Sequence, residues 1–412
     1  MKVFQIATSA TGGAGIAASR LNVALNNIGV NSTLISNKAK DGEYRSNVLN
    51  VRKSIIESFN SKSLTLFQRK IIQSGDDLVT LFSASTLDLD ELIGFDPDLI
   101  HIHSFYNLLN LNDVVNLIKS EIPIFFTLHD ERILTGGCHC TNGCDKFELN
   151  CEKCPQSRML FRSSIVRNHL NLRKILENET NVTLICPSNW MAGQVFKAGL
   201  NPKIHSEVVR NPVSSNYLDN RVFQPNRKSN LHFVVTFVAQ ELQNSYKGLQ
   251  NVLECISNHV DEFRQNNFHF NFVGHGPMLT IKGVSFTQYP NLSESDLIEI
   301  YKSTDLLLVP SKTDNSPNVI FEAAMCGTPF LGSDRAGLPE LSEFFGLQTF
   351  EYGVSDSLRK ALMNAKNTKI DREMIRKLAF ESVNPQKIAE NIKELYQKKL
   401  TEAASMRSNK DF

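Results

Sequence analysis

Residues 305–333, DLLLVPSKTDNSPNVIFEAAMCGTPFLGS, contain two short apolar runs separated by a polar loop and a longer apolar segment. The runs at 305–310 and 329–333 are typical of buried strands, and the segment that begins at residue 319 predicts a helix. A strand, a helix and a second strand in this order predict a βαβ unit with parallel strands. The sequence therefore favours the α/β class of folds.

The same alternation extends along most of the chain and then restarts in its second half. The predicted strands and helices lie at 2–8, 17–29, 31–36, 51–83 (helical but polar), 98–103, 122–129, 181–188, 231–239, 248–260 and 268–274. This pattern predicts two Rossmann-like, doubly wound domains, which we expect to face each other across a cleft. Ligands of such domains bind beyond the carboxyl ends of the strands, so the loops there are the candidate sites.

A turn-rich segment between the halves places the domain boundary near residue 210. We expect an N-terminal domain at 1–209, with a cysteine-rich insertion at 135–158, and a C-terminal domain at 210–384. The last helix begins the segment 385–412 and is expected to pack back on the N-terminal domain. The small polar residues after Thr401 predict a frayed tail.

The composition of the 412 residues limits the classes of function. Charged residues make up 21% and the net charge is +1, so no basic excess marks a nucleic-acid-binding protein. The N-terminus has no secretory pattern, and no run of about 18 apolar residues predicts a transmembrane helix. We therefore expect a cytoplasmic protein, in which disulfides rarely persist.

A glycine-rich loop, TGGAGIAASR, follows the first predicted strand. Gly12, Gly13 and Gly15 would let the backbone approach a ligand closely, and the helix that follows favours an anion at its start. The spacing also fits a dinucleotide-binding fingerprint, but that site needs an acid after the second strand, where Asn37 and Lys38 stand. A plain tight turn is the third interpretation.

Two further loops carry side chains suited to ligand binding. His129 and Asp130 end a buried strand and could bind a sugar hydroxyl or a carbonyl group, although lone histidines are often structural. Lys247 and Gly248 open a helix, where a lysine can contact a diphosphate or simply face solvent.

A fourth loop places two carboxylates around the start of a helix. Asp314 follows the strand, residues 316–318 form the turn, and Glu322 lies in the first turns of the next helix. Such a pair could hold sugar and ribose hydroxyls while backbone N–H groups hold phosphate. Acids around a helix start are also common as caps, so that alternative stays open.

Together these loops resemble the family 4 retaining glycosyltransferases of the GT-B fold, especially the bacterial polysaccharide-assembly branch related to colanic acid transferases. The resemblance extends over nearly the whole chain. The segments that carry it are GGAGIAASRLNVAL, DPDLIHIHSFYNL, FTLHDERILTGGCHC, CEKCPQ, CPSNWMAGQV, VVRNPV, YKGLQNVLECI and DLLLVPSKTDNSPNVIFEAAMCGTP.

The resemblance implies transfer of a sugar from a UDP- or GDP-sugar to a glycan or polyprenyl-diphosphate-linked acceptor of a cell-surface polysaccharide. The anomeric configuration would be retained, without a catalytic divalent metal. It implies sugar contacts for His129 and Asp314, a diphosphate contact for Lys247 and a ribose contact for Glu322. The residues implied in donor binding are Gly12, Gly13, Gly15, Gly248, Asn315, Ser316, Asn318 and Val319.

Two positions depart from the family pattern. Asp314 stands where the family has glutamate, which shortens the reach of the carboxylate. Glu241 stands where many members place an arginine on the diphosphate, and a carboxylate cannot replace a guanidinium there. Arg210 or Arg335 could supply the missing charge, or Lys247 and helix dipoles could act without it.

Five of the eight cysteines lie within residues 138–154, CHCTNGCDKFELNCEKC. The family branch also carries cysteines here, and four thiolates could complete a tetrahedral structural zinc site. The ligands expected for zinc are Cys138, Cys144, Cys151 and Cys154, with His139 and Cys140 as substitutes. A disulfide or redox role and plain packing remain alternatives. The other cysteines, Cys186, Cys255 and Cys326, are expected in the core.

The segment 157–176, SRMLFRSSIVRNHLNLRKIL, predicts a basic helix with no acidic residue. Its basic residues are Arg158, Arg162, Arg167, Arg173 and Lys174. The helix could be an ordinary surface helix packed on the core, or it could dock on an anionic inner leaflet that carries a lipid-linked acceptor.

Two other functions compete with transfer. A nucleotide-sugar 2-epimerase shares the two-domain fold and needs no acceptor. An inactive nucleotide-sugar-binding scaffold would account for Glu241 and for the aspartate at position 314.

Overall fold

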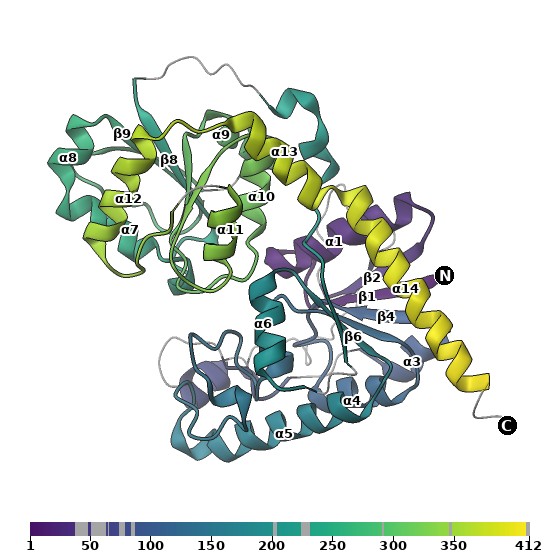
Figure 1. The fold of residues 1–412 in the computed structure, drawn as a ribbon. Coiled ribbons are helices and arrows are strands. Elements are labelled where there is room, and N and C mark those ends of the chain that lie inside the picture. Colours follow the sequence, from purple (N-terminus) through teal and green to yellow (C-terminus); the bar gives the residue numbers. More distant parts are fainter. Residues whose placement is uncertain are drawn as a thin grey trace. The chain divides into compact units, whose positions relative to one another are not determined.

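The computed structural model describes residues 1–37, 48–50, 63–64, 66–73, 79–83, 87–200, 204–223, 231–290, 292–345 and 348–408. These residues divide into two compact units (Figure 1). Unit 1 consists of Met1–Pro212 and Pro385–Phe412, and unit 2 of Val213–Asn384. The chain therefore returns to unit 1 for its last helix.

Unit 1 is built on a parallel sheet. Its strands are β1 (Lys2–Ala7), β2 (Asn31–Ser36), β3 (Val48–Asn50), β4 (Leu99–Ile102), β5 (Ile124–Thr127), β6 (Val182–Cys186) and β7 (His205–Val208). In the described part of the chain they form a seven-stranded sheet in the order β3-β2-β1-β4-β5-β6-β7. The order reverses direction beside β1, as in a doubly wound sheet.

Helices cover both faces of this sheet. The helices of unit 1 are α1 (Gly12–Asn27), α3 (Leu89–Gly94), α4 (Leu111–Lys119), α5 (Arg162–Asn178), α6 (Asn189–Lys197) and α14 (Pro385–Ser408), with short helices η1 (Gln68–Ile72), η2 (Arg132–Leu134), η3 (Lys146–Glu148) and η4 (Met159–Phe161). Apolar residues of α1 and α14 pack on one face, and those of α4 and α5 pack on the other. Figure 1 shows α14 lying along α1, and Tyr396 of α14 is fully buried.

Unit 2 repeats this plan with a smaller parallel sheet. Its strands are β8 (Phe233–Glu241), β9 (Phe268–His275), β10 (Ser285–Tyr289), β11 (Leu306–Val309) and β12 (Phe330–Gly332). In the described residues they form a five-stranded sheet in the order β10-β9-β8-β11-β12. The direction of winding changes between β8 and β11, so the loops after these two strands are the expected ligand loops.

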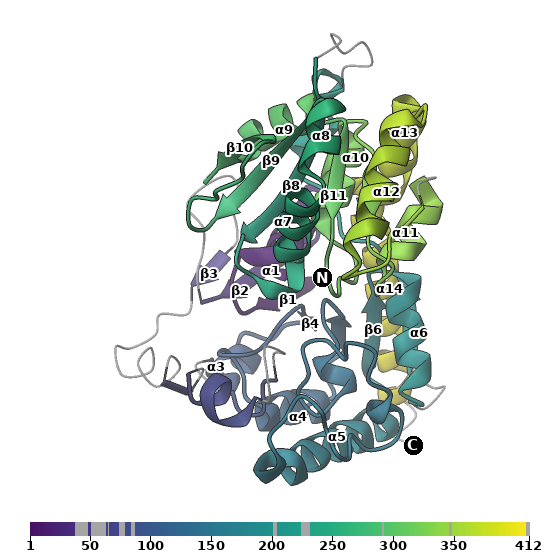
Figure 2. The ribbon, with the colours of Figure 1, turned by 90° about the vertical axis from the view of Figure 1, so that its left-hand side faces the viewer.

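Alternate residues of β11 separate the two cores of unit 2. Leu306 and Leu308 join a core with α7, α8 and α12, whereas Leu307 and Val309 join a core with α9, α10, α11 and α13. Figure 2 shows the sheet with α7, α12 and α13 beside it. The bounds are α7 (Leu249–Asn258), α8 (Val260–Gln265), α9 (Glu294–Ser303), α10 (Asn318–Met325), α11 (Leu338–Phe345), α12 (Ser355–Asn367) and α13 (Arg372–Val383), with short helices η5 (Ser215–Leu218), η6 (Asn220–Val222) and η7 (Ser245–Lys247).

These two parallel-sheet units confirm the predicted α/β class, but the helix predicted at 51–83 needs correction and some short strands were missed. Residues 51–62, 65 and 74–78 lie outside the described residues, and among the described residues of 63–83 only those from 63 to 72 are helical. Val79 instead forms an isolated bridge with Cys138, and residues 80–83 have no regular secondary structure. The strands β7 and β10 were not predicted, because both are short and half polar.

The last helix extends beyond Thr401, where the tail was predicted to begin. Helix α14 continues to Ser408, and residues 409–412 lie outside the described range. Lys399 donates from Nζ to the carbonyl oxygen of Thr180 at 2.6 Å, which holds this part of α14 on unit 1. None of the helices in the described residues is long and apolar enough to cross a membrane.

Candidate functional site

Two predicted site residues of unit 2 contact each other. Lys247 ends η7, which follows β8, and Asp314 lies in the loop after the neighbouring strand β11. Nζ of Lys247 donates to Oδ2 of Asp314 at 2.6 Å, and the hydroxyl of Ser311 donates to the same oxygen at 3.3 Å. The contact joins residues 67 positions apart in the chain. It places a cation and a carboxylate together beyond the carboxyl ends of two central strands.

Gly248 allows this close approach of the two loops. Its φ of 76° lies in the left-handed region, and a Cβ there would lie 1.8 Å from the carbonyl oxygen of Pro310. The N–H of Lys312 also donates to the carbonyl oxygen of Tyr246 at 2.8 Å. A larger residue at position 248 would therefore push the loop of Lys247 away from that of Asp314.

The loop after β11 leads into an uncapped helix start. Pro317 occupies the N-cap position of α10 and provides no side-chain cap, and Asn318 and Val319 begin the helix. The Oγ atom of Ser316 is buried without a hydrogen-bond partner among the described residues. A helix start without a side-chain cap favours an anion, and the hydroxyl beside it could donate a further hydrogen bond.

Gly337 packs directly against this loop. A Cβ on Gly337 would lie 1.9 Å from the carbonyl oxygen of Asn315, and its N–H donates to the carbonyl oxygen of Asp314 at 3.0 Å. The backbone conformation of residues 314 and 315 therefore depends on a glycine more than twenty positions away, which sequence analysis did not identify.

Glu322 is buried one turn inside α10. Its side chain is 5% exposed, and Oε2 accepts a hydrogen bond from the hydroxyl of Tyr301 in α9 at 3.2 Å. Tyr301 is itself fully buried. The carboxylate therefore has a structural partner, and its role as a ribose ligand stays a prediction.

The glycine-rich loop of unit 1 contains one glycine required for packing and another that packing does not require. A Cβ on Gly15 would lie 1.9 Å from the carbonyl oxygen of Ser9, so α1 can approach the end of β1 only with glycine there. A Cβ on Gly13 would meet nothing within 4 Å. Gly12 begins α1 with a φ of 81°, and its N-cap residue Thr11 makes no side-chain cap. The tight-turn interpretation therefore explains Gly12 and Gly15 but not Gly13.

The residue after β2 gives the dinucleotide interpretation no support. Asn37 donates from Nδ2 to the carbonyl oxygen of Asn107 at 2.8 Å, so its side chain is held within the unit. Lys38 lies outside the described residues.

His129 follows β5 and lines a pocket of unit 1. Its Nε2 lies 3.1 Å from Nδ1 of His103, which follows the neighbouring strand β4, and the two rings stack at 5.4 Å. Burial lowers the pKa of His129 to about 4, although the charge of Asp130 opposes this shift. The ring is therefore neutral near pH 7. The residues lining the pocket include His103, Ser104, Tyr106, His129, Asp130 and Arg132.

Asp130 is held by two basic neighbours. Arg132 Nη1 donates to Oδ2 at 2.6 Å, and Nδ1 of His139 lies 3.4 Å from the same oxygen. Burial opposes ionisation of Asp130, but Arg132 and His139 keep its pKa far below the usual value. The guanidinium of Arg132 also lies 4.3 Å from the ring centre of Tyr106. Asp130 is therefore an ionised structural partner beside His129.

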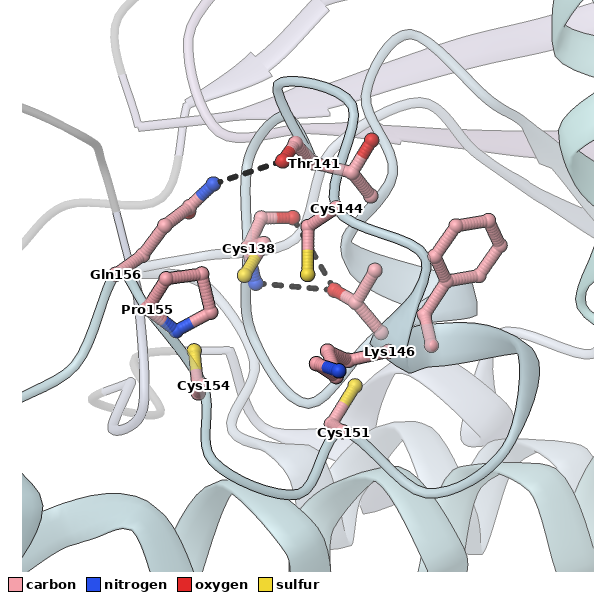
Figure 3. Close-up of a pocket in the computed structure, with 10 residues that line it drawn as sticks. Cys138, Thr141, Cys144, Lys146, Cys151, Cys154, Pro155 and Gln156 are labelled. Carbon is pink, nitrogen blue, oxygen red and sulfur yellow. Dashed lines mark hydrogen bonds between the residues drawn. The ribbon is translucent and has the colours of Figure 1, made fainter.

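The four predicted zinc ligands line one pocket of the cysteine-rich loop. Figure 3 shows their side chains around this pocket, together with Thr141, Lys146, Pro155 and Gln156. None of the eight cysteines forms a disulfide within the described residues. Backbone N–H groups of Gln156 and Ser157 donate to the sulfur of Cys154, that of Gly136 to Cys151 and that of Lys146 to Cys144.

The thiols are not arranged as a formed metal site. In the residues that the structure describes, no three His, Cys, Asp or Glu side chains are placed to hold a metal ion. The thiols of Cys138 and Cys154 share a hydrogen bond, which lowers the pKa of Cys154. The predicted substitutes His139 and Cys140 are absent from the residues that line the pocket. Cys186, Cys255 and Cys326 are buried in the core, as predicted.

The cysteine-rich loop is tied to the segment of His129. The buried carboxylate of Glu131 accepts from the N–H of Thr141 at 2.6 Å and from Nε2 of Gln194 at 2.7 Å. Glu131 lies two residues after His129. Movement of the cysteine-rich loop would therefore reach the residue beside the histidine pocket.

The two arginines that could supply the charge missing at position 241 belong to different units. Arg335 belongs to unit 2, where its Nε lies 3.2 Å from Asp334 Oδ1, whereas Arg210 belongs to unit 1. Glu241 ends β8, in register with His275. Arg335 is therefore the candidate in the same unit as Lys247.

The predicted site residues thus form two groups, one within each unit. Unit 2 brings together Lys247, Gly248, Asp314 and the start of α10, and unit 1 holds His129 and the glycine-rich loop. Sequence analysis missed His103, Gln5 and Tyr301, which contact the predicted residues or one another. The DLIHIH run could have indicated His103, because it ends a strand next to that of His129.

Comparison with known proteins identifies the class. Residues 232–357 match the family model "Glycosyl transferases group 1", so unit 2 contains a glycosyltransferase group 1 domain. The chain is also 35% identical over 66 residues to the putative colanic acid biosynthesis glycosyl transferase WcaC of Escherichia coli strain K12. This match spans 14% of the chain and only 16% of that protein.

Solved structures share the fold along nearly the whole chain. Sucrose-phosphate synthase from Thermosynechococcus elongatus superposes with a TM-score of 0.68 at 13% identity, covering 97% of this chain and 98% of that one. HepE from Anabaena, solved in complex with UDP-glucose, superposes with a TM-score of 0.58 at 15% identity, covering 97% and 100%. The two parallel-sheet units therefore have the GT-B fold of these glycosyltransferases.

Proposed function

We propose that this protein is a family 4 retaining glycosyltransferase that acts in the assembly of a cell-surface polysaccharide. It would move a sugar from a nucleotide-sugar donor to an acceptor hydroxyl. The observation that carries the proposal is the contact between Lys247 and Asp314 within the region that matches the glycosyltransferase model. WcaC, whose name refers to colanic acid biosynthesis, supports the choice of a polysaccharide.

The chemistry of unit 2 suits a leaving nucleoside diphosphate. The ammonium of Lys247 and the uncapped start of α10 would stabilise the negative charge that develops on the diphosphate. The hydroxyl of Ser316 would add a hydrogen bond, and Glu322 would hold the ribose. His129 of unit 1 would bind a hydroxyl of the transferred sugar. We propose a front-face reaction, in which the leaving phosphate takes the acceptor proton and no catalytic divalent metal takes part.

The donor is the first property to test. HepE binds UDP-glucose, so a UDP-sugar is the leading candidate and a GDP-sugar the second. Purified protein would be incubated with UDP-, GDP-, ADP- and dTDP-sugars, with and without a polyprenyl-diphosphate-linked acceptor. Acceptor-dependent release of nucleoside diphosphate supports transfer. An isomerised donor would instead indicate an epimerase, and binding without turnover would indicate a scaffold.

For the cysteine-rich loop we propose a structural zinc ion bound by Cys138, Cys144, Cys151 and Cys154. Four thiols in one pocket have the donor chemistry that zinc prefers, and the N–H groups directed at three sulfurs would stabilise thiolates. Binding would require the sulfurs to lose protons and to draw together. The ion would fix a loop that Glu131 connects to the segment of His129.

The zinc proposal predicts about one zinc ion per chain in protein purified under reducing, metal-replete conditions. Metal content measured by mass spectrometry should fall in Cys154→Ser, whose sulfur lines the pocket, and stay near the wild-type value in Cys140→Ser. A chelator should lower the melting temperature of the wild type and of Cys140→Ser, but not that of Cys154→Ser. Zinc-free wild-type protein, or equal zinc in both variants, would reject the proposal.

We further propose that the short helix η4, directly before α5, rather than the whole basic helix, contacts an anionic membrane that carries the acceptor. Ile165, Leu172 and Leu176 of α5 face the core, and Arg173 is engaged with Glu177 at 2.8 Å. Most of α5 is therefore packed against the core of unit 1. These contacts support the alternative of an ordinary surface helix for most of α5.

The short helix η4, which directly precedes α5, is more exposed. Met159 is 83% exposed and Leu160 is 81% exposed, between Arg158 and Arg162. The ring centres of Phe161 and Phe67 lie 6.3 Å apart, edge to face. Phe67, an exposed residue directly before η1, therefore lies at the same surface. Apolar side chains flanked by arginines suit the interface of an anionic bilayer.

This surface predicts that the double variant Met159→Ser, Leu160→Ser binds anionic vesicles about tenfold more weakly, because burial of even one such side chain exceeds 1.4 kcal/mol. Flotation with vesicles that contain phosphatidylglycerol would measure the bound fraction. Leu170→Ser changes an exposed leucine of the following helix α5, so it is the matched control and should bind like the wild type. Equal binding of all three proteins would contradict the proposal.

A further inference from the structure

A chain of hydrogen bonds leads from the interior of unit 1 to His129. Gln5 lies on β1, His103 follows β4 and His129 follows β5, and these strands are neighbours in the sheet. Oε1 of Gln5 lies 2.9 Å from Nε2 of His103, and Nδ1 of His103 lies 3.1 Å from Nε2 of His129. Gln5 and His103 are 0% and 5% exposed, so bulk water does not compete for these contacts.

The amide of Gln5 has a defined orientation. Its Nε2 atom donates to the hydroxyl of Ser32 at 2.8 Å and lies 3.4 Å from the carbonyl oxygen Oδ1 of Asn22. An amide nitrogen can donate to both of these partners, whereas an amide oxygen in its place would face the oxygen of Asn22. Oε1 is therefore the atom directed at His103.

This orientation determines which nitrogens carry protons. Oε1 of Gln5 can only accept, so Nε2 of His103 must carry the proton. Burial and the neighbouring rings of His101 and His129 hold the pKa of His103 well below its usual value, so the ring is neutral and Nδ1 has a lone pair. Nε2 of His129 must then donate to that lone pair.

The second nitrogen of His129 is left as an acceptor. Because the ring of His129 is neutral and protonated at Nε2, its Nδ1 has a lone pair. No partner of this nitrogen is found among the described residues, and His129 lines the pocket of unit 1. An acceptor lone pair attracts a hydroxyl or an N–H group and repels carboxylate and phosphate oxygens.

We propose that Gln5 and His103 are positioning residues that set the tautomer of His129, so that its Nδ1 accepts a hydrogen bond from a hydroxyl group of the sugar. The identity of the ligand rests on the proposed function, whereas the tautomer does not. The hydrogen bonds from Gln5 through His103 to His129, which we call the relay, make Nδ1 of His129 selective for a neutral hydroxyl group that donates a hydrogen bond. His101 takes no part, because its nitrogens meet the hydroxyls of Tyr396 and Thr127 at 2.6 and 2.7 Å.

The tautomer can be measured in the full-length protein without any ligand. In ¹⁵N-histidine-labelled protein at pH 7, long-range ¹H–¹⁵N spectra should show a protonated Nε2 and an unprotonated Nδ1 for His129. His103→Phe keeps the ring stack but removes the acceptor, and His103→Asn keeps an acceptor oxygen near the position of Nδ1. We expect the first variant to show both tautomers of His129 and the second to retain the wild-type tautomer.

Gln5→Leu tests the same relay from its other end. Loss of Oε1 leaves the tautomer of His103 undefined, so His129 should again populate both forms. This variant keeps the proposal testable if His103→Phe does not fold. A protonated Nδ1 in the wild type, or an unchanged tautomer in a folded His103→Phe or Gln5→Leu protein, would overturn the relay.

Titration with nucleotide sugars tests the relay and the proposed glycosyltransferase function separately. Addition of the sugar nucleotide that binds should shift the ¹⁵N resonance of Nδ1 of His129, and KM for that donor should rise about tenfold in His103→Phe, as for loss of one hydrogen bond, but not in His103→Asn. If the donor binds and this resonance does not move, the sugar contact is wrong. If no nucleotide sugar binds while the tautomer is as described, the proposed function fails and the relay stands.

Discussion

Lys247→Met is expected to reduce the rate of transfer by about 10²- to 10³-fold, the usual effect of removing one donor that stabilises a developing negative charge. Methionine keeps most of the volume of the side chain but has no ammonium group. In the structure this ammonium is 2.6 Å from Asp314 and is already oriented at the carboxyl ends of β8 and β11. The ammonium of Lys247 should therefore mainly stabilise the negative charge that develops on the nucleoside diphosphate as the bond to the sugar breaks.

The same substitution should leave the fold almost unchanged. The side chain of Lys247 is 34% exposed, and a partly exposed ion pair contributes only about 0–1 kcal/mol to stability. The measurement is kcat and KM for donor and acceptor, together with the melting temperature. Lys312→Met removes a neighbouring positive charge and is the matched control, with activity expected near that of the wild type.

A wild-type rate in folded Lys247→Met protein would contradict the assignment of the diphosphate site. A comparable loss of activity in Lys312→Met would indicate that general positive charge, rather than the ammonium held by Asp314, stabilises the leaving group. The two variants together therefore distinguish a specific contact from an electrostatic background.

Glu322→Gln is expected to lower kcat/KM for the donor by about 10- to 100-fold, the range that corresponds to loss of a hydrogen bond to a charged group. Glutamine keeps the volume of the side chain and an oxygen that can accept from Tyr301. The defect should appear mainly in the donor KM, because the ribose does not take part in bond breaking. Steady-state kinetics at varied donor concentration would measure it.

Glu322→Ala should show the same kinetic defect together with a loss of stability. It would leave the buried hydroxyl of Tyr301 without this acceptor, which costs about 1–3 kcal/mol. Unchanged kinetics in Glu322→Gln, with lower stability only in Glu322→Ala, would show that Glu322 serves α9 and α10 rather than the donor. The pair of variants therefore separates the structural role from the binding role.

Much of the fold was predictable from short segments. The run 305–333 indicated a βαβ unit because strand and helix periodicity, and the polar loop between them, are local properties of the chain. The strands β1, β4, β5 and β8 were predicted for the same reason. The short strand β10 was missed, since its side chains are neither fully buried nor strictly alternating.

Candidate positions were also predictable, because ligand loops of parallel sheets follow strand ends. Sequence analysis identified Lys247, Asp314 and His129 on this basis. It could not distinguish the glycines of the first loop, since Gly13 and Gly15 differ only in what surrounds them. It could not show which charges of the basic helix have partners, because Arg173 contacts Glu177 and the carbonyl groups of Glu148 and Leu149 only in the folded chain.

The sequence by itself determined the α/β alternation, the main buried strands and the loops in which chemistry could occur, because these follow from patterns within a few turns of chain. Only the tertiary structure decided which of those residues meet. The contact of Lys247 with Asp314 and the relay from Gln5 through His103 to His129 join distant segments. Such contacts depend on which strands become neighbours in a sheet, and that order is a property of the whole unit.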